Sequence, residues 1–176
     1  MLGDKIIFDF LYSFSHKAMF IDWFFIFLAK YLIYLIILIF IFNILFKLDG
    51  LKKKISLSLL TMFSVIISRG VLTEVIRFFY NAPRPLDNPN IQSLIGHESG
   101  FSFPSGHMAF LIPIALWSFS INKKLGIWLS VLTLLVGIGR IISGVHYPVD
   151  IWGGIVVGII GFYFARFLFR KTNTAS

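Results

Sequence analysis

The sequence predicts an all-α protein, a bundle of helices that spans a membrane. Of its 176 residues, 57% are hydrophobic and only 14% are charged, and the mean hydropathy is +0.87. A soluble domain of this size cannot bury so much apolar surface, so lipid is the expected solvent. The apolar residues form long runs, and no linker or repeat divides them. We therefore expect one integral-membrane domain over residues 1–176.

The positions of the spans follow from the apolar runs, because a helix needs about 20 residues to cross a bilayer. We expect spans at residues 20–46, 55–79, 104–121, 125–142 and 149–169. Residues 1–18 mix charged with apolar side chains over a stretch shorter than a span. That pattern is typical of an amphipathic helix lying in the membrane interface. A short sixth span is the alternative.

Basic residues indicate the topology. Most of those outside the motifs described below lie in residues 47–54, 122–124 and 166–171. Cytoplasmic loops are enriched in lysine and arginine, so these segments are expected in the cytoplasm, with 81–103 and 143–148 on the extracytoplasmic side. The net charge of +8 would also suit nucleic acid. In so apolar a chain, however, lysines mark cytoplasmic loops, and no nucleic-acid partner is expected.

Metal chemistry has little support in the sequence. The chain has no cysteine, so disulfides and thiolate metal sites are excluded. Its four histidines occur in neither an HxxxH nor an HExxH spacing. The carboxylates do not cluster as metal ligands do, so we expect no metal and no cofactor.

The segment Pro104-Ser105-Gly106-His107 opens an apolar run. Proline suits the first turn of a helix, and the next N–H groups then have no intrahelical acceptor. Such a helix end attracts an anion, and glycine allows close approach. Ser105 adds a hydroxyl donor, and His107 is placed to protonate a phosphate ester oxygen. Taken alone, the segment also fits an ordinary helix start with an incidental histidine.

Arginines in apolar segments are the second signal. Each costs about 2.5–3.5 kcal/mol near the centre of a bilayer, so each needs a reason. Arg77, Arg84 and Arg140 are expected at the extracytoplasmic ends of their segments, where three guanidinium groups around one point suit phosphoryl oxygens. Arg69 is expected to pair with Glu74 and to be structural.

The third signal is His146, which precedes Asp150 by four residues, with Pro148 as a helix start between them. The carboxylate would then accept a hydrogen bond from one imidazole nitrogen and leave the other free as a nucleophile. A lone His–Asp pair is more often structural. Opposite a cluster of arginines and His107, it indicates a phosphoryl-transfer site.

The three segments in this order resemble the signature of the type 2 phosphatidic acid phosphatase (PAP2) superfamily, written K-x6-RP, PSGH and SR-x5-H-x3-D. The match covers about residues 77–150 with the flanking spans, and order and spacing both hold. Two positions depart from it. Arg77 replaces lysine, which keeps the charge but changes its reach, and Gly139 replaces the serine before Arg140. Neither departure touches the histidines or Asp150, so we expect an active enzyme.

The resemblance assigns phosphate binding to Arg77, Arg84, Ser105, Gly106 and Arg140. It implies that His146 attacks phosphorus and forms a phosphohistidine while His107 protonates the leaving oxygen. Asp150 orients His146, and water then hydrolyses the intermediate with His107 as base. The family is metal-independent, so the resemblance implies a hydrolase that needs no metal.

Within that superfamily the chain is similar to small bacterial undecaprenyl-pyrophosphate phosphatases of the bacitracin-resistance type. The compact five-span form, the amphipathic N-terminus and His97 carry this similarity. It implies a bacterial cytoplasmic-membrane protein that removes one phosphate from a C55 isoprenoid diphosphate outside the cytoplasm. Phosphatidylglycerophosphate, phosphatidic acid and lipid A phosphates remain alternative substrates, and a non-catalytic lipid-phosphate-binding protein is the alternative class. His97 is interpreted as a solvated loop residue or as an aid to diphosphate recognition.

Overall fold

The computed structural model describes residues 2–172, with the side chains of residues 3–169. Its elements in chain order are α1 (Leu2–Tyr12), α2 (Met19–Ile26), η1 (Phe27–Tyr31), α3 (Leu32–Lys47), α4 (Leu51–Val65), η2 (Ile66–Leu72), α5 (Thr73–Phe79), η3 (Pro85–Asp87), α6 (Gly106–Ser118), α7 (Lys123–Ile142) and α8 (Pro148–Thr172). The described residues form helices and connecting loops with no strand. The predicted all-α class is therefore confirmed.

Two of the long helices each contain a π-helical segment. α2, η1 and α3 form one continuous helix, Met19–Lys47, and α4, η2 and α5 form another, Leu51–Phe79; each has 29 residues. The second begins earlier than expected because it includes the lysines after Leu51. α7 and α8 are also long and apolar enough to cross a membrane.

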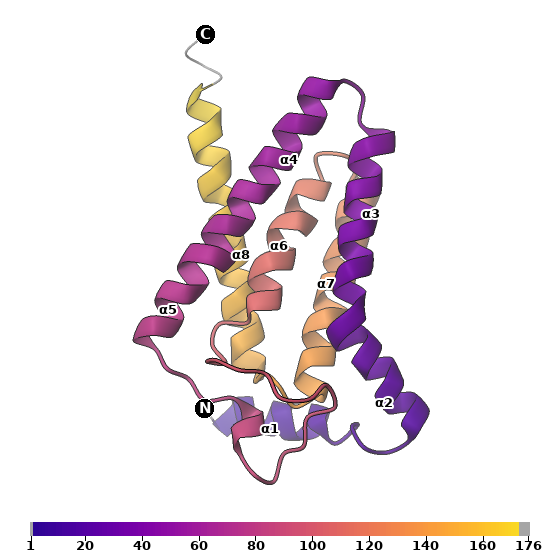
Figure 1. Ribbon diagram of the computed structural model, residues 1–176, viewed down its shortest axis with the longest axis vertical. Coiled ribbons are helices and arrows are strands. Elements are labelled where there is room, and N and C mark those ends of the chain that lie inside the picture. The colour runs from indigo at the N-terminus through magenta and orange to yellow at the C-terminus, as the bar shows by residue number, and fades with distance from the viewer. Residues whose placement is uncertain (1, 173–176) are drawn as a thin grey trace.

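α6 is shorter than the predicted span, which was expected at 104–121. It covers 13 residues, Gly106–Ser118, with Ser105 as its N-cap. The expectation that Pro104 lies in the first helical turn was therefore wrong. α6 lies inside the bundle, against α4, α7 and α8 (Figure 1). Most of its side chains are buried, including Leu111 and Trp117.

Small residues bring α8 close to α6 and to the second long helix. A Cβ at Gly158 would lie 2.6 Å from Ile112 Cβ, and one at Gly161 would lie 2.7 Å from Ser68 Cβ. Ala165 continues this face and is fully buried. The small residues on this face of α8 therefore allow close helix packing.

The outer faces of the long helices are apolar and exposed. Side chains such as Phe46, Phe79 and Trp152 are mostly uncovered by the protein itself. Exposing so much apolar surface to water would cost much free energy, whereas lipid tails solvate such a surface. The helices that carry these side chains are therefore membrane-spanning, as predicted.

The loops divide between the two ends of the bundle as the basic residues predicted. The α3–α4 and α6–α7 connections lie at one end, where α8 also finishes, and the loops 80–105 and 143–147 lie at the other (Figure 1). The basic side chains of residues 170 and 171 are outside the described part. All three motif segments consequently meet at one end of the molecule.

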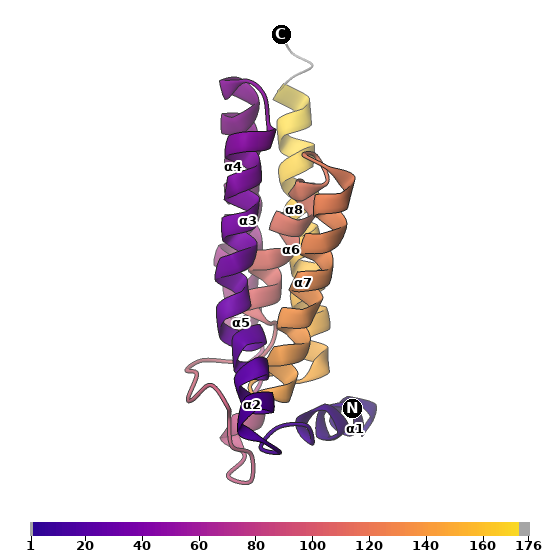
Figure 2. The same ribbon diagram turned by 90° about the vertical axis from the view of Figure 1, so that its right-hand side faces the viewer.

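α1 lies across that same end, at a steep angle to the bundle (Figure 2). It has 11 residues, about 16 Å of helix, which is too short to cross a bilayer. Phe8 is buried against the bundle, while Ile6 and Phe10 are exposed. The arrangement fits the predicted interfacial helix and not a sixth span.

Candidate active site

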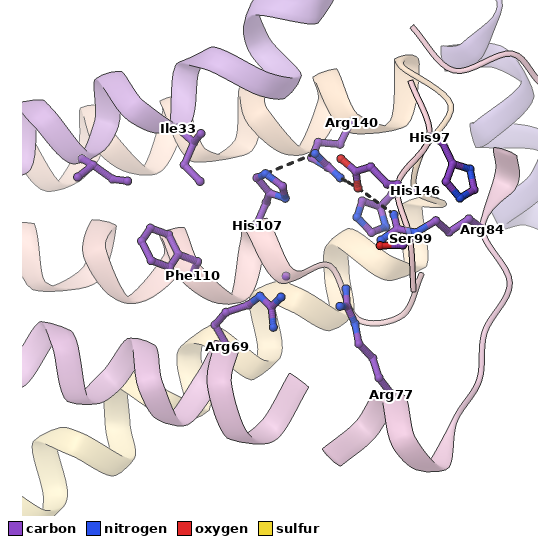
Figure 3. A pocket seen from close by; sticks show the side chains of 13 residues that line it. Ile33, Arg69, Arg77, Arg84, His97, Ser99, His107, Phe110, Arg140 and His146 are labelled. Carbon is purple, nitrogen blue, oxygen red and sulfur yellow. Dashed lines mark hydrogen bonds and ion pairs between the residues drawn. The ribbon is translucent and has the colours of Figure 1, made fainter. Parts of the chain in front are cut away.

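A pocket of about 500 Å³ opens at the loop-bearing end of the bundle. Its polar side is formed by arginines, histidines and one carboxylate, and its apolar side by Ile33, Ile37 and Phe110. Arg69 and Arg77 reach into it from one side (Figure 3). Arg84, Arg140 and His146 lie on the opposite side (Figure 3).

His146 is positioned by the loop between α7 and α8. Gly144 turns the chain with a φ of 77°, and α8 then begins at Pro148, as predicted. This places Asp150 in the first turn, where its Oδ2 lies 3.3 Å from His146 Nδ1. The ring is 1% exposed, yet it lines the pocket. The predicted contact between the two residues is confirmed.

The Asp150 carboxylate is itself held in place. Its Oδ2 accepts a 2.7 Å hydrogen bond from the Tyr147 N–H and another from the Ser102 hydroxyl. Ser102 Oγ is also 3.3 Å from His146 Nδ1. With Nδ1 protonated and facing these oxygens, the other ring nitrogen keeps its lone pair.

The surroundings of His146 favour the neutral ring. Burial lowers its pKa well below the ordinary value, and the positive charges of Arg140 and Arg84 lower it further. Both causes penalise the imidazolium form. The ring is therefore favoured in its neutral form, with one nitrogen free of a proton.

Arg84 and Arg140 form an inner arginine pair beside His146. Arg84 donates hydrogen bonds to the carbonyls of Gly100, at 2.9 Å, and Val145, at 3.1 Å. Both side chains are almost completely buried. Two buried guanidinium groups need anionic partners, because an uncompensated buried charge is costly.

The anion beside this inner pair is Glu98. Its Oε2 lies 3.2 Å from Arg84 Nη1 and also accepts a hydrogen bond from Arg140. Burial opposes ionisation of Glu98. The charge and hydrogen bond of Arg140, together with the charge of Arg84, outweigh the effect of burial and hold the pKa of Glu98 below its ordinary value. A carboxylate thus takes the place between two guanidinium groups that suits a phosphoryl oxygen.

Arg69 and Arg77 form an outer arginine pair that shares Glu74. Glu74 pairs directly with Arg69, as predicted, and lies 3.6 Å from Arg77 Nη1. Arg77 also donates to the Pro104 carbonyl at 3.1 Å. Arg69 was expected to be structural alone, but it also lines the pocket.

The Pro-Ser-Gly-His segment contributes Gly106 and His107 to the pocket. His107 Nε2 lies 3.4 Å from Arg140 Nη1. The Ser105 N–H does not point free of the helix end as expected, because it donates to the Asp150 carbonyl at 2.9 Å. Ser105 is fully buried, and its hydroxyl has no hydrogen-bond partner among the described residues. Its contact with phosphate stays a prediction.

The structure therefore gathers most of the predicted site and adds to it. His107, His146 and the predicted arginines share one pocket, with Asp150 directly behind His146. Ser102 and Glu98 were missed. Among the described residues, no group of three histidine or acidic side chains is placed to hold a metal ion.

The sequence around this site matches a known family. Residues 58–174 match the family model of the PAP2 superfamily. The chain belongs to the PAP2 superfamily. The resemblance seen in the motifs is thereby confirmed, and the protein is a phosphatase of a family that acts on membrane lipids.

Similar proteins have related activities. The chain is 33% identical to undecaprenyl-diphosphatase BcrC of Bacillus subtilis over 92% of its own length and 82% of that protein's. It is 32% identical to phosphatidylglycerophosphatase B of the same organism over 61% of its own length and 56% of that protein's.

Solved structures agree on the fold. LpxE of Aquifex aeolicus superposes with a TM-score of 0.70 and 27% identity, covering 90% of this chain and 92% of that one. The phosphatidylglycerolphosphate phosphatase of Bacillus subtilis superposes with a TM-score of 0.66 and 21% identity, covering 96% and 85%. At that identity the second likeness concerns the fold alone.

Proposed function

We propose that this protein removes the terminal phosphate of an isoprenoid diphosphate, undecaprenyl pyrophosphate, at the extracytoplasmic face of the bacterial cytoplasmic membrane. The observation that carries the chemistry is His146, buried against Asp150 and opening on a pocket of arginines. Binding a phosphate requires neither a nucleophile nor a group that orients it. The pair therefore argues for catalysis over a passive lipid-binding role.

The reaction consists of two in-line displacements. The free nitrogen of His146 bonds to the terminal phosphorus while the bond to the bridging oxygen breaks, and His107 gives that oxygen its proton. Water then attacks the phosphohistidine with His107 as base. Arg77, Arg84 and Arg140 stabilise the charge on the equatorial oxygens.

The pocket also suits a lipid. Ile33 and Ile37 on α3 and Phe110 on α6 form its apolar side. An isoprenoid chain lying against these side chains would leave its phosphates at the arginines. The same side chains would disfavour small soluble phosphate esters, which offer no apolar group in return.

The proposed lipid substrate is inferred from the similar proteins. Undecaprenyl-diphosphatase BcrC aligns over nearly the whole chain, whereas phosphatidylglycerophosphatase B aligns over less of it. A diphosphate substrate is also favoured by the pocket, whose cationic side chains extend beyond a single arginine pair. Lipid monophosphates remain the second candidate because of the similarity to phosphatidylglycerophosphatase B.

A substrate panel tests this proposal. Phosphate release by the purified protein in detergent would be compared for undecaprenyl pyrophosphate, phosphatidylglycerophosphate, phosphatidic acid and lipid A. We expect the highest kcat/KM for the isoprenoid diphosphate, with no loss on adding EDTA. Preference for a glycerophospholipid would refute the substrate assignment, and strong inhibition by EDTA would refute the metal-free mechanism.

The membrane side needs a separate test, and the absence of cysteine from the chain makes it simple. Asn90→Cys, in the loop beside the pocket, should react with a membrane-impermeant maleimide in intact cells. Lys53→Cys, at the opposite end of the bundle, should react only after the cells are permeabilised. The reverse pattern would place the pocket in the cytoplasm.

A further inference from the structure

Arg69 has a position that pairing with Glu74 does not explain. It belongs to η2, where the π-helical turn changes the register of the long helix, and such turns are frequent at functional sites. Its neighbour Ser68 fixes this turn against α6, because Ser68 Oγ donates to the Ala109 carbonyl at 2.7 Å. Arg69 is therefore held over the start of α6 by packing.

The fit between Arg69 and Gly106 is close. A Cβ at Gly106 would lie 2.6 Å from Arg69 Nε and 3.2 Å from its Cζ. Glycine at this position therefore leaves room for the guanidinium group, and a larger residue would push the Arg69 side chain aside. The consequence is that Arg69 lies directly beside the first turn of α6, inside the pocket.

This placement is electrostatically unfavourable without an anion. A helix N-terminus carries a partial positive charge, so a cation beside it is repelled, and Arg77 adds a second cation on the same side of the pocket (Figure 3). Glu74 contacts both, but it is about half exposed, at 53%, and an exposed carboxylate compensates weakly. The outer pair thus keeps an excess of positive charge that faces the pocket.

The two arginine pairs have the same composition. Arg84 and Arg140 share Glu98, and Arg69 and Arg77 share Glu74. In each case a carboxylate contacts two guanidinium groups, which is the coordination that one phosphoryl group would accept. The inner pair lies beside the nucleophile, whereas Arg69 lies nearer to the apolar side, where Phe110 lines the pocket (Figure 3).

We propose that Arg69 forms a second phosphate subsite, beside Arg77, that binds the phosphate remaining on the lipid. The inner pair, Arg77 and His146 then hold the phosphoryl group that is transferred. The bond from His146 to the terminal phosphorus forms, the bond to the bridging oxygen breaks, and that oxygen leaves on the Arg69-bound phosphate with a proton from His107. This inference rests on the proposed diphosphatase activity and explains how the pocket prefers a diphosphate to a monophosphate.

The test compares a diphosphate with a monophosphate of the same lipid chain, farnesyl pyrophosphate and farnesyl phosphate, in Arg69→Gln. Losing one charge-assisted contact should lower kcat/KM for the diphosphate by about 10- to 100-fold. The monophosphate, which has nothing to place at Arg69, should change by less than about threefold on the same principle. Arg69→Lys should recover part of the loss, because it restores the charge without the fork.

Arg166→Gln is the matched control, because Arg166 is exposed on α8, far along the helix from the pocket. It should leave both substrates unchanged. Inhibitors give a second measurement that does not need turnover of the diphosphate. Arg69→Gln should weaken inhibition by methylenediphosphonate and leave inhibition by orthovanadate, which mimics one phosphoryl group, unchanged.

The outcomes separate the two proposals. An equal loss for both farnesyl substrates, or no loss for either, would refute the second subsite while leaving the diphosphatase activity standing. If the unmodified protein released no phosphate from any isoprenoid diphosphate, the proposed function itself would be refuted. Retained monophosphatase activity in Arg69→Gln serves as the check that the variant is folded.

Discussion

His146 and His107 line the same pocket but are held in different ways. His146 lies in a loop, is almost fully buried, and has Nδ1 within 3.3 Å of both Asp150 and Ser102. His107 lies in the first turn of α6, and its Nε2 faces an Arg140 nitrogen at 3.4 Å. A nucleophile benefits from one fixed, unprotonated nitrogen, whereas a group that gives and regains a proton needs access to the leaving group and to water. The surroundings alone therefore distinguish the two proposed roles.

The largest expected effect is the loss of the proposed nucleophile. His146→Ala should lower kcat by at least about 10⁴-fold, as removal of an essential catalytic group does elsewhere. Substrate labelled in its terminal phosphate should give an acid-labile phosphoprotein with the unmodified chain and none with the variant. His16→Ala, outside the pocket, is the control and should retain turnover. Turnover retained in His146→Ala would end the phosphohistidine mechanism.

A smaller and more selective effect is expected for His107. His107→Gln should lower kcat on the lipid diphosphate by about 10²- to 10⁴-fold, the usual contribution of a general acid. With p-nitrophenyl phosphate, whose leaving group departs without a proton, the first step should be largely spared. The second step still lacks its base, so phosphoprotein should accumulate in a burst. Equal losses on both substrates, without a burst, would remove the distinction between the histidines.

The sequence predicted which segments meet at the loop-bearing end of the bundle, but not every contact among their side chains. The apolar runs define the spans because hydrocarbon thickness fixes their length, and the prolines and glycines around His107 and His146 mark where the helices begin. These are local signals. Together with the spacing from Arg77 to Asp150, they were sufficient to predict one shared pocket.

The parts that were missed depend on the path of the long loop. Glu98 reaches the inner arginine pair because Arg84 binds the Gly100 carbonyl and draws this loop across the pocket. Ser102 meets Asp150 because its own N–H is bound to the Ala82 carbonyl at 2.9 Å. Neither residue has a local pattern that indicates its partner. The Ser105 N–H was wrongly assigned for the same reason, since its acceptor belongs to α8.

Ser102 sharpens the comparison between the histidines, because its hydroxyl contacts Asp150 Oδ2 and His146 Nδ1. Ser102→Ala should lower kcat by about 10-fold with little change in KM, the effect of one hydrogen bond that positions a catalytic group. In an Asp150→Asn background the same change should cost less, because the two residues act on one ring. A loss seen equally in both backgrounds would show that Ser102 acts elsewhere, and a thermal melt would control for stability.

The smallest effect concerns the protonation of His146. Burial and the nearby arginines lower its pKa, so the folded protein binds this proton only at a pH below the ordinary value of about 6.5. The unfolded chain binds it near that value, so this residue makes the folded state less stable as the pH falls below about 6.5. Histidine-selective ¹⁵N NMR in detergent should show a neutral ring protonated at Nδ1 at about pH 6, assigned by its loss in His146→Gln. An imidazolium signal for His146 at neutral pH would contradict the proposed nucleophile, since a protonated ring has no lone pair with which to attack phosphorus.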